Sequence, residues 1–233
     1  MPGPAGLRRL PVQPLGIQLW LADLDSPVDD ADHWLDEAEQ ARAARFVFEA
    51  DRRRYRAAHV AMRWVLAQRF RLPPRAALAL GPHGKPRLPG PATGSFNLSH
   101  AGGWALIGAR TGGEIGVDLE LLRPIDDLDG MSRHHLAREE LDELSAAPDA
   151  EAANRAFLSG WTRKEACVKA LGSGLSVAPD TFAAGLGDAP RELIIHFEDR
   201  EVPVRVASVF VGAGMLAAVA EVIDPDRDNR LEQ

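Results

Sequence analysis

The spacing of apolar and polar positions along the chain predicts its helices and strands. Over residues 51–70 the apolar positions recur every three or four residues, which predicts an amphipathic helix that ends at Leu72-Pro73-Pro74. Further helical patterns cover about 30–45, 135–145 and 151–171. Short apolar or alternating runs predict strands at 17–24, 78–80, 86–88, 95–98, 104–109 and 114–121, and in the closing runs RELIIHFE, VPVRVASVF and MLAAVAEV.

The order of these elements predicts an α+β protein in two halves. A strand, helices and strands are followed by helices and strands again, and the pattern changes near residues 110–124. We therefore expect an N-terminal half at 1–112, a C-terminal half at 113–224, and a polar tail at 225–233 that frays.

The stretch IGVDLELLRP, residues 115–124, places two acids in an apolar run. If it is a strand, Asp118 and Glu120 point to the face opposite Ile115, Val117 and Leu119. Their Cα atoms then lie roughly 6.6 Å apart, close enough for both carboxylates to bind one cation. The alternative is an amphipathic strand whose acidic face is exposed to water.

Composition places the chain among ordinary globular proteins and narrows its setting. Hydrophobic residues make up 45% and charged residues 26%, which is typical of a protein with a sizeable core. The single cysteine, Cys167, excludes an internal disulfide and a cysteine-rich metal site, and favours a reducing compartment. The first residues lack a signal-peptide pattern and no run is long enough to span a bilayer, so we expect a cytoplasmic protein.

The charge is unevenly distributed. The chain carries −7, yet the segment from Arg42 to Arg63 holds seven arginines against Glu49 and Asp51, a local charge of +5. A basic segment on an acidic protein suits a compact phosphate-bearing ligand better than a nucleic acid, which the remaining surface would repel. The alternative is that most of these arginines lie on a solvated helix face.

Two residues of the segment FLSGWTRKEACVKALGSGLS are candidates for chemistry. Glu165 lies beside an apolar stripe, at the edge between core and water, where an acid can reach a neighbouring strand. Lys169 follows four residues later and shares its face. The alternative is a surface ion pair worth about 0.2–0.5 kcal/mol.

Two loops add polar candidates. In HGKPRL, Lys85 lies between a glycine and a proline, where its cation is expected to be held out toward a ligand. FNLSHAGGW delivers Asn97, Ser99 and His100 into a glycine-rich turn, and the last two are expected to donate hydrogen bonds to an anion. The pair His134-His135 is expected at a solvent-facing helix start and not in a metal site.

Taken in order, GKP, FNLSH, GVDLE and WTRKEACVKALGSGLS resemble the Sfp-type 4'-phosphopantetheinyl transferases over about residues 17–220. The resemblance implies two similar α/β halves related by a pseudo-twofold axis. It also implies transfer of the phosphopantetheine arm of coenzyme A to a serine of an acyl or peptidyl carrier protein, with Mg²⁺ and release of 3',5'-ADP.

The resemblance also implies roles for individual residues. Asp118, Glu120 and Glu165 would bind the magnesium ion, and Lys169 would stabilise the charge on the leaving nucleotide. Glu139 would act as general base, with Glu140 or a metal-bound water as the alternative. Coenzyme A would be bound by Arg42, Arg54, His83, Gly84, Lys85, Asn97, Ser99, His100 and Lys169. Glu39 departs from the pattern, because some relatives have lysine there.

Two other classes compete with the transferase. A binding protein that retains the coenzyme A cleft without turnover is permitted by the departure at His134 and His135, although all three acids and Lys169 are present. A nucleic-acid-binding module would need aromatic residues between the arginines and a basic overall charge, and the sequence has neither. By analogy with the family, the two-half fold favours a monomer, and the lack of a long apolar run leads us to expect no membrane partner.

Overall fold

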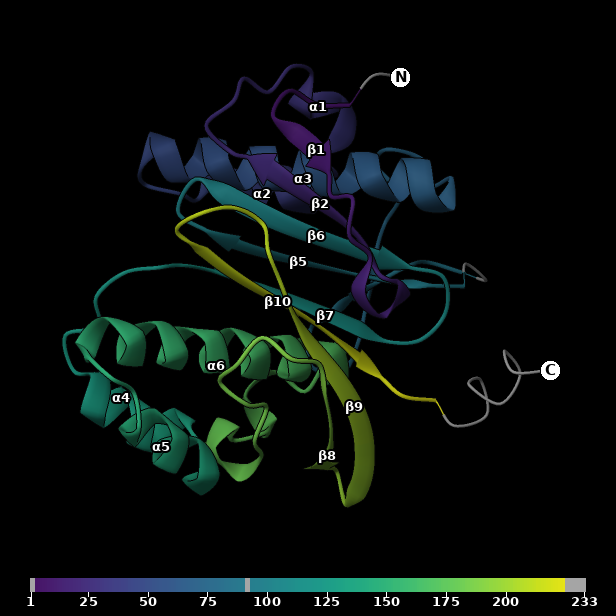
Figure 1. Ribbon diagram of the computed structural model, residues 1–233. Helices are drawn as coiled ribbons and strands as arrows, with labels where there is room; N and C mark the ends of the chain where they lie inside the picture. Colours follow the sequence, from purple (N-terminus) through teal and green to yellow (C-terminus); the bar gives the residue numbers. More distant parts are fainter. Residues whose placement is uncertain (1–2, 91–92, 225–233) are drawn as a thin grey trace.

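The computed structural model describes residues 3–90 and 93–224, so the predicted polar tail at 225–233 lies outside the described residues. The chain folds into two four-stranded antiparallel sheets, which lie between two long helices (Figure 1). The mixed α+β class predicted from the sequence is confirmed. The pseudo-twofold relation between the halves stays a prediction.

The first sheet comes from the N-terminal half. Its strand order is β1-β2-β6-β5, and its strands are β1 (Leu7–Arg9), β2 (Gln18–Asp23), β5 (Ser95–Ala101) and β6 (Trp104–Arg110). Helix α3 (Glu49–Phe70) covers one face, where Ala58, Met62 and Val65 pack against Trp20 and Ile107. These are the positions that the helical period of the sequence assigns to the core. The short strands β3 (Ala79–Leu80) and β4 (Pro86–Arg87) form a separate hairpin-like pair.

The predicted helix over about 30–45 is two helices. α1 (Ala31–Trp34) ends at Leu35, which is extended, and α2 (Glu37–Ala44) begins after Asp36. The Asp36 carboxylate accepts from the Glu39 amide at 2.8 Å, and the Glu39 carboxylate accepts from the Asp36 amide at 3.0 Å. This reciprocal capping satisfies two amide donors at a helix start, so the chain restarts a helix here.

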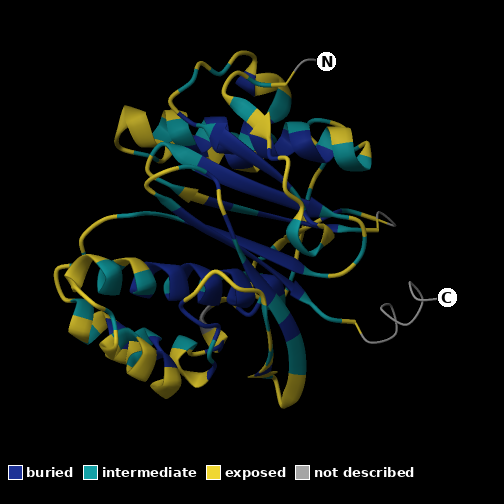
Figure 2. Ribbon diagram, viewed as in Figure 1, coloured by how far each residue is buried: buried dark blue, intermediate teal, exposed yellow. Residues whose placement is uncertain are grey.

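The second sheet comes from the C-terminal half. Its order is β7-β10-β9-β8, and its strands are β7 (Ile115–Leu121), β10 (Met215–Val222), β9 (Arg200–Val209) and β8 (Arg191–Phe197). Helix α6 (Ala150–Leu171) lies against it, and two shorter helices, α4 (Leu128–His135) and α5 (Arg138–Ser145), lie outside α6 (Figure 1). Figure 2 shows that β7, β10 and the inward side of α6 are mostly buried, whereas β8, α4 and α5 are largely exposed or only partly buried.

Helix α4 is absent from the sequence prediction. The expectation that His134 and His135 begin a helix is wrong, because they are the last two residues of α4. Asp127 caps the start of α4 by accepting from the Gly130 amide at 2.9 Å, and Leu136 is extended and separates α4 from α5. The spacing of apolar residues did not predict this helix, because Ser132 is its only buried residue.

Strand β7 is buried along most of its length on both faces, so the alternative of an acidic face exposed to water is wrong. One face carries Ile115, Val117 and Leu119, which pack with residues of both sheets in a shared core. The other face lies against α6, and a Cβ added at Gly116 would overlap the main-chain oxygen of Ala166. The glycine therefore permits the helix backbone to lie directly on the strand.

The two sheets meet along β5 and β7 through side chains. Ser95 donates to the Gly113 carbonyl, Asn97 accepts from the Val117 amide at 2.9 Å, and Ser99 accepts from the Leu119 amide at 3.3 Å. Alternate residues of one strand thus satisfy the backbone of the other. Among the described helices, none is long and apolar enough to cross a membrane.

Candidate functional site

One face of α6 lies across β7 and brings the predicted catalytic residues together. Trp161, Glu165 and Lys169 are four residues apart and therefore share this face. The Lys169 ammonium binds Asp118 Oδ1 at 2.5 Å, and the Trp161 indole nitrogen donates to Glu120 Oε1 at 3.2 Å. The alternative of a surface ion pair between Lys169 and Glu165 is wrong, because the Lys169 ammonium binds Asp118.

Ser99 completes the surroundings of Asp118. Its hydroxyl donates to Asp118 Oδ1 at 2.8 Å and accepts from the Lys169 ammonium at 3.0 Å. Together with the bond from the Leu119 amide, these contacts engage the hydroxyl fully. The anion that Ser99 was expected to meet is thus, in this structure, the carboxylate of Asp118.

Asp118, Glu120 and Glu165, hereafter the acid cluster, influence one another electrostatically. Burial raises the pKa of Asp118, which is 4% exposed, and Lys169 and Ser99 act in the opposite direction. Burial, followed by repulsion from Asp118, raises the pKa of both Glu120 and Glu165. Repulsion among three half-buried or buried acids is relieved by a cation placed between them.

The donor chemistry of the acid cluster fits a divalent cation. Asp118 Oδ2 is buried without a hydrogen-bond partner, and a carboxylate oxygen in that state is a strong ligand for a hard cation such as Mg²⁺. The set is not preassembled, however: in the described part of the chain no group of three or more His, Cys, Asp or Glu side chains is arranged to hold a metal ion. The magnesium ligands therefore stay a prediction.

A cavity of about 310 Å³ opens beside the acid cluster, hereafter the central cavity. It brings together five of the predicted coenzyme A residues and Glu165, although they lie far apart in sequence. Its lining includes His83, Gly84, Lys85, Asn97, Glu165 and Lys169. Both halves of the chain therefore contribute to one pocket.

The expectation that Lys85 holds its cation out toward a ligand is wrong. The ammonium is buried and binds Glu114 at 2.8 Å, the Ile115 carbonyl at 2.9 Å and the Ala170 carbonyl at 3.0 Å. Three acceptors use all three of its donors. Lys85 thus fastens the β3–β4 region to β7 and to the end of α6, and contributes its alkyl chain to the cavity wall.

Arg42 lines a second cavity, of about 390 Å³, which shares Pro86 and Asn97 with the central cavity. The Arg42 guanidinium lies 5.8 Å from the centre of the Tyr55 ring and makes no ion pair among the described residues. It is therefore available to a phosphate group. Arg54 and His100 line a third cavity, of about 280 Å³, but Arg54 already binds Asp25 through two bonds of 2.9 Å.

Most of the basic segment is neutralised by tertiary ion pairs. Arg54 and Arg53 hold the pKa of Asp25 down at about 2 by hydrogen bonds to its carboxylate. Arg63, counted among arginines on a solvated face, is in fact 3% exposed and binds both Asp36 and Glu39. Glu39, the position at which some relatives have lysine, is therefore a partner of Arg63. Of the seven arginines, Arg42 and Arg45 alone lack an acid partner within the described residues.

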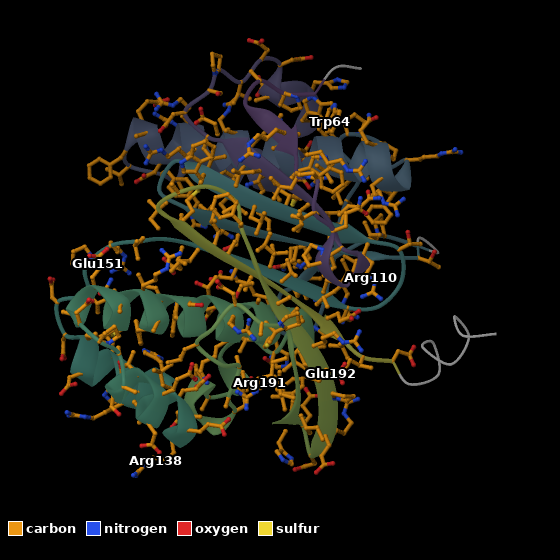
Figure 3. All side chains as sticks on the ribbon, viewed as in Figure 1. Trp64, Arg110, Arg138, Glu151, Arg191 and Glu192 are labelled. Atoms are coloured by element: carbon orange, nitrogen blue, oxygen red, sulfur yellow. The ribbon has the colours of Figure 1, made fainter. Side chains whose placement is uncertain are left out.

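The two general-base candidates differ sharply in their surroundings. Glu140 is fully buried and pairs with Lys164 at 2.6 Å, so this alternative is wrong. Glu139 is exposed and pairs with Arg191 of β8 at 2.7 Å; Figure 3 shows Arg191 near that strand, on the side of α5. Glu139 has no hydrogen bond or ion pair with the acid cluster in this structure, and its role as base stays a prediction.

The sequence did not reveal that Trp161 contributes to the site, nor that Lys164 forms a buried ion pair with Glu140. The spacing of four residues between Trp161 and Glu165 would have placed the indole on the catalytic face. For Lys164 no local signal exists, because a lysine at a helix position is ordinarily exposed. Its partner Glu140 lies 24 residues earlier on another helix.

His59 gives the protein a measurable pH dependence. It lines the Arg42 cavity, stacks on Tyr55, and donates through Nδ1 to the Tyr55 carbonyl at 2.9 Å. Burial lowers the pKa of His59 from 6.5 to about 4. Between these values the unfolded chain binds a proton that the folded protein does not, so stability falls as the pH drops from 6.5 toward 4.

We expect this histidine to account for up to about 3 kcal/mol of the loss of unfolding free energy over that pH range. Urea unfolding of wild type and His59→Gln at several pH values measures it, and the variant should show a flatter profile. His196→Gln, which alters an exposed residue of β8, is the control. Identical pH profiles for wild type and His59→Gln would contradict the assignment.

Comparison with known proteins agrees with the resemblance seen in the motifs. Residues 114–209 match the model of the 4'-phosphopantetheinyl transferase superfamily, and residues 24–112 match that of the 4'-phosphopantetheinyl transferase N-terminal region. A putative 4'-phosphopantetheinyl transferase of Synechocystis sp. is 34% identical over 163 residues, which cover 68% of this chain and 66% of that protein.

Two further relatives extend the comparison. The 4'-phosphopantetheinyl transferase HetI of Nostoc sp. is 35% identical over 167 residues, 69% of this chain and 70% of HetI. The 4'-phosphopantetheinyl transferase ffp of Bacillus subtilis is 28% identical over 182 residues, 78% of this chain and 79% of ffp. The matches span about two thirds of the length of the first two relatives. Because both halves match in order and HetI is 35% identical over about two thirds of both chains, the chain belongs to the 4'-phosphopantetheinyl transferase superfamily of enzymes.

Proposed function

We propose that the protein transfers the 4'-phosphopantetheine arm of coenzyme A to a serine of an apo acyl or peptidyl carrier protein, and releases 3',5'-ADP in a Mg²⁺-dependent reaction. The observation that carries this proposal is the position of the acid cluster and Lys169 beside the central cavity, together with the unpartnered buried oxygen of Asp118. The names of the relatives support the reaction type.

The acid cluster would hold the magnesium ion. When bound, the ion supplies positive charge that clamps diphosphate oxygens and offsets the charge that develops during phosphoryl transfer. The residues of the cluster contribute by binding: Glu165 comes from α6, and Asp118 and Glu120 come from β7. Mutual repulsion among these carboxylates favours the binding of a cation between them.

Lys169 and Arg42 provide the remaining positive charge. The Lys169 ammonium lines the central cavity and lies at the acid cluster, so it is placed to contact both a diphosphate and Asp118. Arg42 has no competing carboxylate and would bind a phosphate of the nucleotide. Arg54 would have to exchange Asp25 for a phosphate, and we therefore assign it a smaller share of coenzyme A binding.

The remaining walls of the coenzyme A site would be formed by His83, Gly84, Asn97 and His100. The Asn97 side-chain oxygen is held by the Val117 amide, and this bond fixes the amide group at the cavity edge. Gly84 has a φ of 81° in the turn before Lys85, a conformation that favours glycine. We thus propose that residues 1–112 chiefly bind the nucleotide and residues 113–224 the metal, in a cytoplasmic monomer.

Mass spectrometry tests the proposal directly. Incubation with Mg²⁺ and coenzyme A should add the mass of one phosphopantetheine group to at least one of a panel of apo carrier proteins, and no addition should occur when the carrier serine is replaced by alanine. Binding of coenzyme A without any addition across the panel would instead favour the non-catalytic binding protein.

A further inference from the structure

Among the described residues, Trp161 is the only one of α6 whose side chain donates a hydrogen bond to Glu120. Its indole nitrogen donates to Glu120 Oε1 at 3.2 Å, one helical turn before Glu165 and two turns before Lys169. Helix and strand are thus joined twice across the acid cluster: Trp161 holds Glu120 at one end, and Lys169 holds Asp118 at the other. Glu165 lies between these two contacts along the helix.

The indole ring is itself held from the opposite side. His135, the last residue of α4, meets the Trp161 ring edge-on with 4.5 Å between ring centres. An edge-to-face contact of aromatic rings is favourable and restricts the orientation of both. His135 Nδ1 is buried without a hydrogen-bond partner, so packing against Trp161, and not hydrogen bonding through this atom, accounts for the position of the imidazole.

We propose that Trp161 is a positioning residue for Glu120, and that His135 fixes the indole ring in the orientation this requires. Among the described residues, the indole N–H donates to Glu120 alone. It engages one carboxylate oxygen and leaves the second free to bind a cation.

A positioning residue is useful for Glu120 because a glutamate side chain is flexible. A glutamate has one more rotatable bond than an aspartate, and Glu120 lies near the end of β7, where it is only half-buried. Fixing one oxygen in advance reduces the conformational freedom that cation binding would otherwise remove. Asp118 obtains the same restraint from Ser99, which is a second instance of a side chain orienting an acid of the cluster.

This inference rests on the magnesium site of the proposed function, and its test therefore measures metal binding separately from activity. Mg²⁺ is titrated by calorimetry into wild type, Trp161→Phe and Trp64→Phe, each saturated with coenzyme A. Phenylalanine retains the ring and removes the N–H. We expect Trp161→Phe to weaken Mg²⁺ binding on the order of 10-fold and to recover transfer activity at high Mg²⁺.

Trp64→Phe is the matched control. Trp64 lies on α3 in the N-terminal half (Figure 3), and its indole nitrogen has no hydrogen-bond partner among the described residues. This variant should bind Mg²⁺ as wild type does. Should Trp161→Phe fail to fold, His135→Ala replaces it; this variant loosens the ring, leaves the N–H in place, and should weaken Mg²⁺ binding by a smaller factor.

Equal Mg²⁺ affinity in wild type and Trp161→Phe would overturn the inference while leaving the proposed function intact if both proteins still modified the carrier. Loss of activity that no Mg²⁺ concentration restores, with unchanged Mg²⁺ affinity, would also overturn it. Wild-type protein that neither binds Mg²⁺ nor modifies any carrier would instead refute the proposed function and the inference together.

Discussion

Asp118→Asn is expected to lose phosphopantetheine transfer by about 1,000-fold or more. Loss of several kcal/mol of charge stabilisation in the transition state corresponds to at least that factor. The substitution exchanges a carboxylate for a neutral amide at the most buried member of the acid cluster, where Lys169 and Ser99 both bind. Transfer is measured as the rate of mass addition to an apo carrier protein at saturating Mg²⁺ and coenzyme A.

The same variant should fold as well as wild type. Because burial raises the pKa of Asp118, its ionised form is less favourable in the folded protein than in the unfolded chain, and an amide removes this penalty at neutral pH. The melting temperature of Asp118→Asn should therefore equal or exceed that of wild type. Because Asp118 is buried and does not face solvent, asparagine tests its charge better than alanine, which would also leave a cavity.

Asp129→Asn provides the control for this prediction. Asp129 is an exposed acid of α4 that pairs with Arg133 on the surface. Its replacement should leave transfer unchanged. Retention of more than about a tenth of the wild-type rate by Asp118→Asn would exclude the aspartate from the proposed charge-stabilising role.

Lys164→Met is expected to lower the free energy of unfolding by about 3–5 kcal/mol. Lys164 and Glu140 form an ion pair of 2.6 Å, and each side chain is 1% exposed. The ammonium also binds the carbonyls of Pro179 and Phe182, and the carboxylate accepts from the Gly185 amide at 2.9 Å. Methionine fills a similar volume but leaves the carboxylate as an unpaired buried charge.

A double variant isolates the cause. If the unpaired charge dominates, Lys164→Met with Glu140→Gln should be more stable than Lys164→Met alone, because the glutamine is neutral and can still accept the Gly185 bond. Arg133→Met breaks an exposed pair of the same protein and should cost less than about 1 kcal/mol. Urea unfolding followed by circular dichroism gives all four values. Equal stability of wild type and Lys164→Met would show that the buried pair contributes nothing.

The elements that the sequence predicted correctly share one property. α3 and α6 each run for 22 residues with apolar positions that recur at helical spacing, and strands such as β2, β6 and β10 are short, nearly continuous apolar runs. Such patterns predict which face of a helix or strand is buried, even when the elements that pack against it are not known. The prediction failed at α4, whose residues barely meet the core, and at Leu35, where a capping box interrupts what looked like one helix.

By itself the sequence determined the class of the fold and the family, because these depend on local patterns and on motifs in a fixed order, whereas the role of the acid cluster as a metal site stays a prediction. Only the tertiary structure decided that β7 is buried on both faces, that Lys85 is fully engaged by protein acceptors, and which acid each arginine and lysine binds. Lys169 binds Asp118, which lies 51 residues earlier in the chain. Arg63 binds Asp36, which lies 27 residues earlier. Burial and ion pairing depend on which elements pack together, and no local period in the chain encodes that.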